Sequence, residues 1–445
     1  METGELITTE LSILEEVRLT AFKNFSGATL PIEELTLLVG RNGSGKSNAL
    51  DGLWVLSRLA QGDDVRDALD GGRDGPAVRG GAAGCAPFGS NSFSLGCTVR
   101  TGASTVRLDV RVQVAPSVQV VAETVSLNGT VLVETDPPLQ DSGDIIASWN
   151  NSKKGPNPKV SFRASRLLAG QVAARVPVNT HAGQRIHLAA AQALAALRSV
   201  FVLDPVPHLM RQYVPSRDIV LRRDADNVSA AVASLMREPS VKRRLCEALG
   251  RLNEQEIVNL TISRSDLDDV MLALSESFAG KARAVSARVM SDGSLRFLAI
   301  LVALLQAPTT DTDSEAASSE EAMGQTLLVI EELENGLHAS QAHLLIELVR
   351  EEVGRRRVRA LATAHSPALL DALTGDEHRS VMVCQRRSDG RSVLHRLAEL
   401  PNYLDIVASG GLGAAAVKDR LREEAPSSSV SPSAALAKIF AGGRR

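Results

Sequence analysis

A glycine-rich loop near the N-terminus carries the clearest chemistry in this sequence. Residues 40–47 read G-R-N-G-S-G-K-S, after an apolar run at 35–39 and before a segment with helical apolar spacing at 48–54. A strand, such a loop and a helix in this order are typical of a phosphate-binding loop. The glycines let backbone N–H groups point at phosphates, and the helix N-terminus favours negative charge. The sequence therefore predicts a site for a nucleoside triphosphate.

The residues of this loop have expected parts in binding ATP and Mg²⁺. Lys46 should reach the β- and γ-phosphates, and the Ser47 hydroxyl should bind the metal. The other predicted nucleotide-binding members of the loop are Gly40, Arg41, Asn42, Gly43, Ser44, Gly45 and Asn48. A glycine turn with an accidental lysine is disfavoured by the flanking strand and helix. Phe22 and Phe25, just ahead of the loop strand, could lie over the adenine, but a place in the core is favoured.

A second candidate group of residues is a pair of acids after an apolar run. Residues 326–330 predict a buried parallel strand, and Glu331 and Glu332 follow it directly. Ligands in open α/β sheets bind at the carboxyl ends of the strands. Glu331 would hold Mg²⁺ through water, and Glu332 would orient or deprotonate the attacking water. A surface pair that merely ends a strand is the plainer alternative.

Three further motifs resemble those of ABC-type AAA ATPases of the RecF, SMC and OLD-like branch. The run S-D-G-S at 291–294, before an apolar helix, is similar to their signature loop. The run E-N-G-L-H at 334–338 is similar to their D-loop, and A-H-S at 364–366 to their switch histidine. The resemblance covers the P-loop region and about residues 286–397. The ordered set of five motifs is specific to this group.

The sequence also departs from the pattern of that group. Leu333 and Ala339 stand where proline is common, and Glu331 stands where aspartate is commoner. The signature is shortened in its glycines, and no glutamine loop is placed. These departures bear on the rate of hydrolysis more than on the fold.

The resemblance implies a homodimer that forms on ATP binding. In such heads, the P-loop of one subunit faces the signature of the other, so Ser291, Asp292 and Gly293 would contact the partner's γ-phosphate through a helix N-terminus. His365 would sense the γ-phosphate and would complete the catalytic set with Glu332 and Lys46. A hydrogen-bonded loop histidine stays open as the alternative for His365, and a structural role stays open for His338.

The implied fold is an α/β P-loop NTPase of the ABC-type head class, with a mixed β-sheet core flanked by helices. The ATPase core is expected at 1–62 and 286–400. Alternating apolar residues from 93 to 135, with an Asn-Gly turn at 128–129, predict an antiparallel β subdomain at 91–137. The remaining expectations are a flexible loop region at 138–185, a helical insertion at 186–285, an acidic disordered insertion at 307–324 and a flexible tail at 424–445.

Composition restricts the class of protein and the cellular compartment to be expected. The chain has 445 residues, 44% hydrophobic and 23% charged, with a net charge of −3, which suits a globular protein with more than one domain-sized unit. No apolar run approaches the roughly 18 residues that span a bilayer, and the acidic N-terminus does not resemble a signal peptide. We therefore expect a cytoplasmic protein with no membrane partner. Its scattered cysteines are expected to be reduced: Cys85, Cys97, Cys246 and Cys384.

The leading functional hypothesis is an ATP-hydrolysing, dimerising switch or motor that acts on DNA or on a partner effector, in DNA repair or anti-phage defence. The alternative is a nucleotide-sensing regulator that hydrolyses little and holds a toxin or nuclease partner. An ABC transporter ATPase is disfavoured by the E-N-G-L-H motif and the long insertions.

Two basic runs, at 355–359 and 386–387, could contact DNA phosphates, although such runs are more often solvated faces. The residues after 397 are too few for a fused nuclease domain. A nuclease or toxin is therefore expected on another chain.

Overall fold

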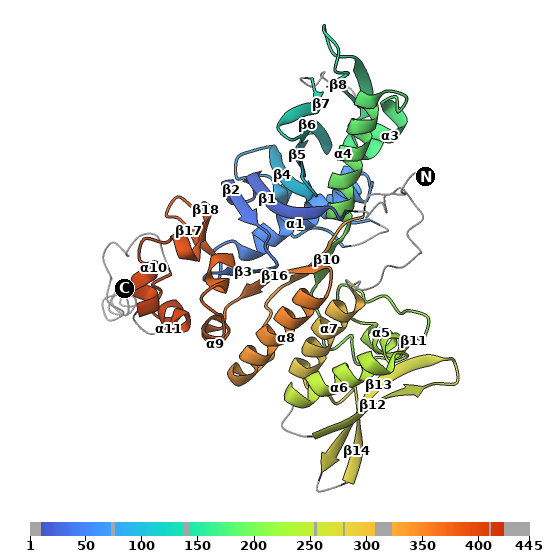
Figure 1. Cartoon of the computed structure of the whole chain (residues 1–445), viewed down its shortest axis with the longest axis vertical. Coiled ribbons are helices and arrows are strands. Elements are labelled where there is room, and N and C mark those ends of the chain that lie inside the picture. The colour runs from blue at the N-terminus through green and yellow to red at the C-terminus, as the bar shows by residue number, and fades with distance from the viewer. Residues whose placement is uncertain are drawn as a thin grey trace, which may run out of the picture.

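The computed structural model describes residues 10–72, 76–136, 143–252, 256–278, 281–307, 323–408 and 411–421. The acidic insertion, apart from its terminal residues, and the C-terminal tail that the sequence predicted as disordered or flexible lie outside these ranges. One mixed sheet of 14 strands crosses most of the molecule, and a sheet of four strands lies at one end of it (Figure 1). The expected α/β architecture is confirmed.

The site is built on the parallel part of the large sheet. Its neighbouring strands, in spatial order, are β10 (Val200–Leu203), β15 (Thr326–Ile330), β16 (Val358–Ala364), β3 (Leu35–Val39) and β17 (Val381–Arg386). They are short apolar runs because helices cover both of their faces. The strands predicted at 35–39 and 326–330 are confirmed.

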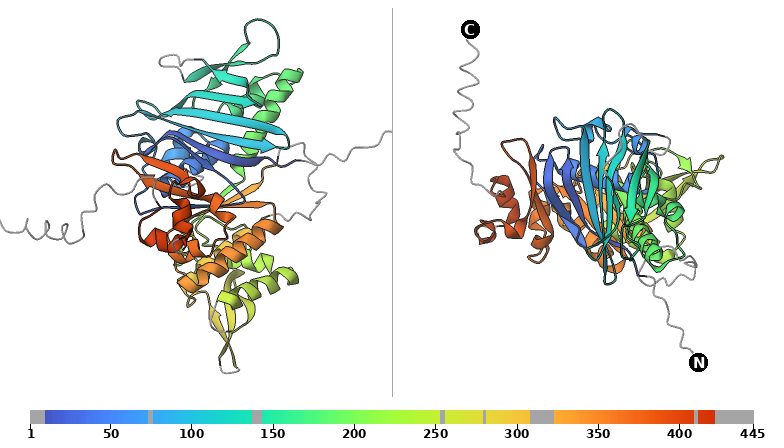
Figure 2. Two further views of the ribbon diagram at one scale, coloured as in Figure 1. Left: turned by 60° about the vertical axis from the view of Figure 1, so that its left-hand side comes forward. Right: turned by 90° about the horizontal axis from the view of Figure 1, so that it is seen from above.

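The antiparallel part continues the same sheet. After β17 the order is β18 (Ser392–Arg396), β2 (Phe25–Pro31), β1 (Ile13–Phe22), β4 (Ser92–Thr101), β5 (Ser104–Gln113), β6 (Gln119–Leu127), β7 (Thr130–Thr135), β8 (Asp144–Trp149) and β9 (Lys159–Arg163). Strands β4 to β7 form the predicted meander. Because β4 pairs with β1, with Val17 opposite Cys97, this part is joined to the parallel strands through the sheet (Figure 2).

The prediction of a flexible loop at 138–185 is wrong for the described residues. This stretch contains β8 and β9, the short helices η2 (Ala169–Gln171) and α3 (Val172–Arg175), and the start of α4 (His181–Arg198). Ile145, Ala147, Trp149 and Phe162 are buried, so the two strands bury apolar residues on one face. The Pro- and Gly-rich composition marks only the connection between them.

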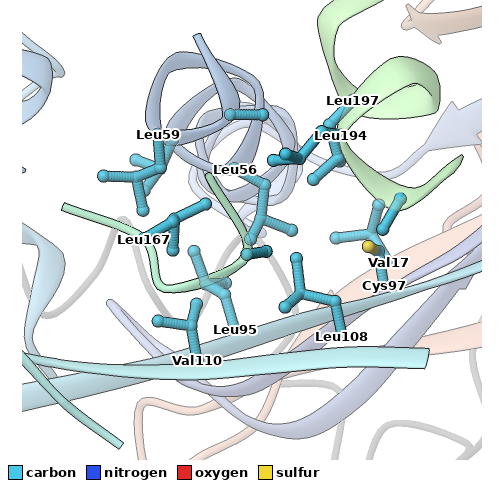
Figure 3. Close-up of a cluster of buried hydrophobic side chains, with 14 of the residues drawn as sticks. Val17, Leu56, Leu59, Leu95, Cys97, Leu108, Val110, Leu167, Leu194 and Leu197 are labelled. Carbon is cyan, nitrogen blue, oxygen red and sulfur yellow. The ribbon is translucent and has the colours of Figure 1, made fainter. Parts of the chain in front are cut away.

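One helical layer packs under the antiparallel strands. It consists of α1 (Lys46–Ala60), α2 (Val65–Asp70), η1 (Ala83–Cys85) and α4. Figure 3 shows Leu56 and Leu59 of α1 and Leu194 and Leu197 of α4 above side chains of β4 and β5. Phe22 and Phe25 are almost fully buried in this core, so the core role favoured for them is confirmed.

The second helical layer covers the other face of the parallel strands. It consists of α7 (Asp292–Gln306), η3 (Ala339–Gln341), α8 (Ala342–Arg355) and α9 (Pro367–Asp371). The described chain then ends in η4 (Glu377–Ser380), η5 (Leu397–Glu399), α10 (Tyr403–Ala408) and α11 (Leu412–Val417), with α11 packed on α9.

The insertion at 186–285 is mixed rather than helical. Besides most of α4 and β10 it holds α5 (Val228–Leu235), α6 (Pro239–Leu252) and the small sheet of β11 (Val214–Pro215), β12 (Glu256–Arg264), β13 (Asp269–Phe278) and β14 (Lys281–Ser286). A single helix over 228–252 is excluded because Pro239 cannot continue a helix and begins α6 instead. Leu260, Leu272 and Leu274 give the small sheet its buried face.

The structure bears on the expectations about the cysteines and about membrane-spanning segments. The four cysteines are free, and three of them are buried. In the part of the chain that the structure describes, no helix is long and apolar enough to cross a membrane.

Candidate nucleotide-binding site

The phosphate-binding loop lies at the carboxyl end of β3, between β16 and β17. Gly40, Gly43 and Gly45 have φ angles of 150°, 77° and 116°, a region of backbone conformation that glycine adopts at low cost. A Cβ atom at Gly40 would lie 2.3 Å from the Cys384 carbonyl oxygen, and one at Gly45 would lie 2.6 Å from the Ser392 hydroxyl. The loop therefore requires glycine for both conformation and space.

Residues of the loop are braced from behind by other strands. The Cys384 thiol and the Ser392 hydroxyl both donate to the carbonyl oxygen of Ser44. The Asn48 amide donates to Asn24 Oδ1 at 2.8 Å, so its side chain supports the loop from the protein side. Burial raises the pKa of Cys384 to about 11, which keeps this thiol protonated.

Lys46 lies inside the loop. Its ammonium donates to the carbonyl oxygens of Gly40 at 2.8 Å and Arg41 at 3.1 Å. Burial lowers the pKa of Lys46, against the nearby carboxylates of Glu331, Glu332 and Glu334. The ammonium is thus held on weak carbonyl acceptors, which a phosphate oxygen could replace with a stronger, charge-assisted hydrogen bond.

The remaining loop residues face outward, with one exception. Arg41 and Asn42 are exposed, and Arg41 forms an ion pair of 3.3 Å with Asp419, just after α11. The Ser44 hydroxyl is buried and finds no hydrogen-bond partner among the described residues. Arg41, Gly40 and Ser44 line one wall of a cavity of about 440 Å³ whose other walls are the His365 loop, the end of β17 and α11.

The two acids predicted after β15 take different positions. Arg79 donates to the carboxylate of Glu331 at 2.9 Å, and the Ser47 hydroxyl lies near enough to this carboxylate to help lower its pKa. Burial opposes ionisation of Glu331, but these hydrogen bonds and the charges of Arg79 and Arg223 outweigh it and lower its pKa. Ser47 and Glu331, the two residues predicted to hold Mg²⁺, are therefore neighbours, and Glu331 is ionised.

Arg79 is a site residue that the sequence did not predict. It stands in the loop between α2 and η1, and its guanidinium bridges Glu331 to Asp51 of α1 at 2.8 Å. Asp51 is only 2% exposed and also binds Lys23 at 2.8 Å. Burial disfavours the charge, yet Asp51 and Glu331 together raise the pKa of Arg79. A single arginine in a Gly- and Asp-rich stretch gave no spacing signal from which this role could be inferred.

Glu332 is exposed and has a strained backbone. Its φ angle is +54°, which is unfavourable for a residue with a side chain and is common at functional sites. Its N–H donates to the Thr363 hydroxyl at 2.8 Å, and the Asn335 amide donates to its carboxylate at 2.9 Å. The turn therefore aims a carboxylate, positioned by Asn335, into solvent beside the phosphate loop.

His365 is tied to the acidic turn through its backbone. The N–H groups of His365 and Ser366 both donate to Glu334 Oε1. Burial, and then the charge of Lys46, lower the pKa of His365, so its imidazole is neutral near pH 7. The structure therefore brings together Lys46, Ser47, Glu331, Glu332 and His365. His338, by contrast, caps the helical turn η3, a role of the structural kind left open for it.

The signature residues lie elsewhere. Ser291 caps α7 by accepting the Ser294 N–H at 3.0 Å, and Asp292 binds Arg211 at 2.6 Å. A Cβ atom at Gly293 would lie 2.2 Å from the carbonyl oxygen of Gly336, so α7 touches the turn at 334–338. Within the described residues, Ser291 and Asp292 form hydrogen bonds and ion pairs with Ser294 and Arg211 and with no residue of the phosphate loop.

Two of the arginines predicted as possible DNA contacts are structural. Arg356 binds Glu352 at 3.0 Å and donates to two carbonyl oxygens at the end of α7, with its side chain 8% exposed. Arg359 donates to the Ile32 carbonyl oxygen at 2.6 Å. For these residues the DNA-contact prediction is wrong, because both guanidinium groups are already held by backbone carbonyl oxygens and are not free to bind phosphate.

The residues around the loop suit a nucleotide and a metal ion. The glycine conformations, the buried Ser44 hydroxyl without a partner and the weakly held Lys46 ammonium all provide for phosphate oxygens. The paired oxygens of Ser47 and Glu331 are hard ligands of the kind that Mg²⁺ prefers. Within the described ranges no group of three or more His, Cys, Asp or Glu side chains could hold a metal ion, so any such ion would depend on phosphate oxygens as further ligands.

Comparison with known protein families decides the relationship. The family described as "AAA domain, putative AbiEii toxin, Type IV TA system" matches residues 35–93 and 178–371, more than half of the chain. The chain belongs to this AAA family. The matched residues contain the phosphate loop, both acids, the signature and His365, and they leave out strands β5 to β9. This AAA protein therefore has the fold of a P-loop nucleotide-binding ATPase.

Solved structures with some likeness to the AAA protein are heads of SMC proteins. An SMC head domain from Thermotoga maritima is 12% identical, with 86% of this chain and 98% of that chain covered and a TM-score of 0.39. An Smc head from Pyrococcus furiosus with an extended coiled coil, bound to the C-terminal domain of ScpA, is 11% identical, with 90% and 99% covered and a TM-score of 0.44. An SmcHead bound to the C-winged helix domain of ScpA is 14% identical, with 86% and 97% covered and a TM-score of 0.46. No curated protein sequence matches the chain.

Proposed function

We propose that this AAA protein binds and hydrolyses ATP and that ATP joins two copies of the chain. The observation that carries the proposal is the division of the site. The phosphate loop, Glu331, Glu332 and His365 converge on one place, whereas the signature at 291–293 begins α7 and makes its contacts with Ser294, Arg211 and Gly336. A second copy would bring its signature to the phosphate loop of the first, and the same contact would be repeated by symmetry.

The residues of the loop would hold the triphosphate. Its backbone N–H groups and the Lys46 ammonium would bind phosphate oxygens, and Lys46 would leave its two carbonyl acceptors to do so. Ser47 and Glu331 would hold Mg²⁺, which supplies positive charge at the phosphates during transfer. The neutral His365 can accept or donate a hydrogen bond at the γ-phosphate.

Glu332 is the residue best placed to act on the attacking water. Its exposed carboxylate is oriented by Asn335 and its backbone is fixed by Thr363, and both constraints pre-organise it for that role. The partner's signature helix would place its N-terminal N–H groups and dipole at the transferred phosphate, where negative charge accumulates. Hydrolysis would therefore be fast only in the dimer.

Arg79 sets the state of the metal site before nucleotide arrives. Together with Lys23, which also pairs with Asp51, it balances the charges of Glu331 and Asp51, so the two acids can lie close together without a metal ion. Binding of Mg²⁺ at Glu331 would compete with this ion pair and would free one side of the guanidinium. A nucleotide-bound form with Arg79 turned toward phosphate follows from that competition.

The output of the switch is proposed to be a partner effector, such as a nuclease or toxin on another chain, or DNA. The family description names a type IV TA system, which favours a partner protein. The second candidate function, a regulator with little hydrolysis, is favoured by the Arg79–Glu331 ion pair at 2.9 Å, because that pair slows metal binding. A cytoplasmic location remains a prediction.

One experiment separates these functions. Steady-state ATP hydrolysis is measured for the wild type and for Glu332→Gln, with and without DNA at several salt concentrations. A switch or motor gives hydrolysis that Glu332→Gln abolishes, and DNA binding, if it occurs, falls steeply with salt. Equal and negligible rates in both proteins, with no response to DNA, would leave only the regulator.

A further inference from the structure

A separate cavity lies at the far end of α1 from the phosphate loop. It has a volume of about 560 Å³ and is bordered by the outer face of α1, the loop that follows it, and the edge strand β10. Twelve residues of α1 separate Lys46 from Arg58, or about 18 Å along the helix. The cavity shares no lining residue with the one beside the phosphate loop, and its size is within the range of small-molecule sites.

The strongest feature of this cavity is Arg223. Its guanidinium carbon lies 4.0 Å from the centre of the Trp54 ring, stacked as arginine often stacks on aromatic faces. Among the residues that the structure describes, no hydrogen bond or ion pair is formed by this guanidinium. Burial lowers the pKa of Arg223, against the charges of the nearby acids Asp204, Glu331 and Asp51. A partly buried cation whose N–H donors are unused is costly, and it favours an anionic acceptor.

The second arginine of the cavity has long contacts with its neighbours. Arg58 has a side chain that is 10% exposed and lies 3.7 Å from Asp63, and it also donates to the Pro76 carbonyl oxygen at 3.5 Å. Both contacts are long for a guanidinium. Arg58 therefore adds positive potential and donors that a ligand could use beside Arg223.

The other walls are suited to a planar polar group. Trp54 is one of only two tryptophans in the chain, and Ser57 and Gln61 border the same space. A stacked indole and guanidinium form a platform on which a nucleobase can lie, and hydroxyl and amide groups can meet the polar edge of a base. A phosphate would meet the arginine donors in the fork geometry that guanidinium groups favour.

We propose that the cavity formed by Trp54, Arg58 and Arg223 binds a nucleotide unit, either a free mononucleotide or the end of a nucleic-acid strand, at a site distinct from the triphosphate site. The phosphate binds Arg223 and Arg58, and the base stacks on the platform of Trp54 and Arg223.

A ligand bound in this cavity would change the electrostatic environment of Glu331 in the ATPase site. The charge of Arg223 acts on Glu331 and on Arg79, and its backbone carbonyl oxygen accepts the Asp204 N–H at 2.8 Å. Leu203 pairs with Ile330 in parallel register, so Asp204 and Glu331 follow at adjacent strand ends. A phosphate on Arg223 cancels that positive charge and weakens its support of the Glu331 carboxylate.

The test uses the fluorescence of Trp54. Trp149→Phe leaves Trp54 as the one tryptophan of the chain. Lys46→Ala is included to prevent nucleotide binding at the phosphate loop. This double variant is titrated with AMP, with inorganic phosphate and with a short single-stranded oligonucleotide. We expect saturable changes with AMP or the oligonucleotide, and tighter binding of the oligonucleotide identifies a nucleic-acid end rather than a free mononucleotide as the ligand.

The decisive comparison adds Arg223→Gln. Loss of the charge-assisted hydrogen bonds should weaken binding about ten-fold or more, whereas Arg222→Gln, the neighbour paired with Asp218 and Asp226, should bind as before. Should Arg223→Gln fail to fold, Arg223→Lys keeps the charge and loses the planar fork, and the same weakening is expected. Absence of saturable binding, equal affinity in the Arg223 variants, or inorganic phosphate binding as tightly as the nucleotides would overturn the proposal.

Discussion

The phosphate loop and the signature loop are both helix N-termini, but the protein builds them in opposite ways. The phosphate loop is braced from the protein side by Cys384, Ser392 and Asn24, and Lys46 occupies it. The signature loop is exposed at Ser291 and Asp292, and its backbone at Gly293 packs against the turn at Gly336. The residues that would hold phosphate at the phosphate loop all come from one chain. The exposed signature residues would reach a nucleotide only on a second copy. The difference between the two loops is what a two-chain site requires.

The largest expected effect is a loss of ATP affinity at the phosphate loop. Lys46→Ala removes the ammonium that would bind the β- and γ-phosphates, and a buried charge-assisted contact of this kind is worth several kcal/mol. ATP affinity, measured by calorimetry, should fall about 100-fold or more. Lys153→Ala, an exposed lysine in the connection between β8 and β9, is the matched control and should bind as the wild type does. Unchanged affinity in Lys46→Ala would remove the phosphate loop from the account.

The next effect separates the two loops. Gly293→Ala brings a Cβ atom to 2.2 Å from the Gly336 carbonyl oxygen, so the signature must shift while the phosphate loop stays intact. ATP affinity should remain near that of the wild type, and the hydrolysis rate should fall about 100-fold, as when a donor to the transition state is lost. Gly354→Ala, where the added methyl meets open space, is the control. Wild-type hydrolysis by Gly293→Ala would show that the signature takes no part.

A third change tests the network behind the metal site. Arg79→Gln leaves the buried Asp51 with Lys23 as its remaining partner and leaves Glu331 without its ion pair. The free energy of unfolding in urea should fall by about 3 kcal/mol, the lower end for a broken buried ion pair, because Arg79 is itself half exposed. Arg66→Gln, an exposed arginine of α2, should change stability little. A loss no larger than that of Arg66→Gln would mean that Asp51 does not need Arg79.

The smallest effect lies far from both loops. Burial raises the pKa of Glu123 to about 7 against two backbone N–H donors at 2.7 Å. A raised folded-state pKa means that the native state binds a proton that the unfolded state releases. The stabilisation is therefore present below pH 4.5 and is lost as the pH rises through 7. Between pH 5 and 7 the wild type should lose about 2 kcal/mol that Glu123→Gln does not lose.

The control for this pH dependence is Glu134→Gln, an exposed acid on β7. It should keep the pH dependence of the wild type in the same thermal or urea unfolding series. If Glu123→Gln and Glu134→Gln follow the same pH curve, Glu123 titrates normally and does not contribute to the pH dependence.

The sequence predicted the parts of the site that depend on contiguous residues. The phosphate loop, the two acids after a buried strand and His365 each follow a strand of the parallel sheet, so local pattern and tertiary position coincide. Arg79 and Thr363 could not be predicted, because they reach Glu331 and Glu332 from distant segments and their residue types are common in loops.

The same reasoning explains the predictions from sequence that were wrong. Strands β8 and β9 are short and flanked by Pro- and Gly-rich residues, and their stability comes from Ile145, Trp149 and Phe162 packing against distant parts of the sheet. Arg356 and Arg359 belong to a basic run that looks solvated, yet each is satisfied by backbone carbonyls of other elements. Burial of a charged side chain depends on tertiary contacts that no local pattern records.

The central claim is that ATP joins two copies of the chain through exposed signatures. It is tested most directly by the mass of Glu332→Gln in solution, measured by light scattering with saturating ATP and Mg²⁺, since slowed hydrolysis should preserve the joined state. The account predicts twice the mass of one chain with ATP. It predicts the mass of a single chain without nucleotide, and also for the double variant that carries both Glu332→Gln and Lys46→Ala. A single-chain mass for Glu332→Gln at saturating ATP and Mg²⁺ would contradict it.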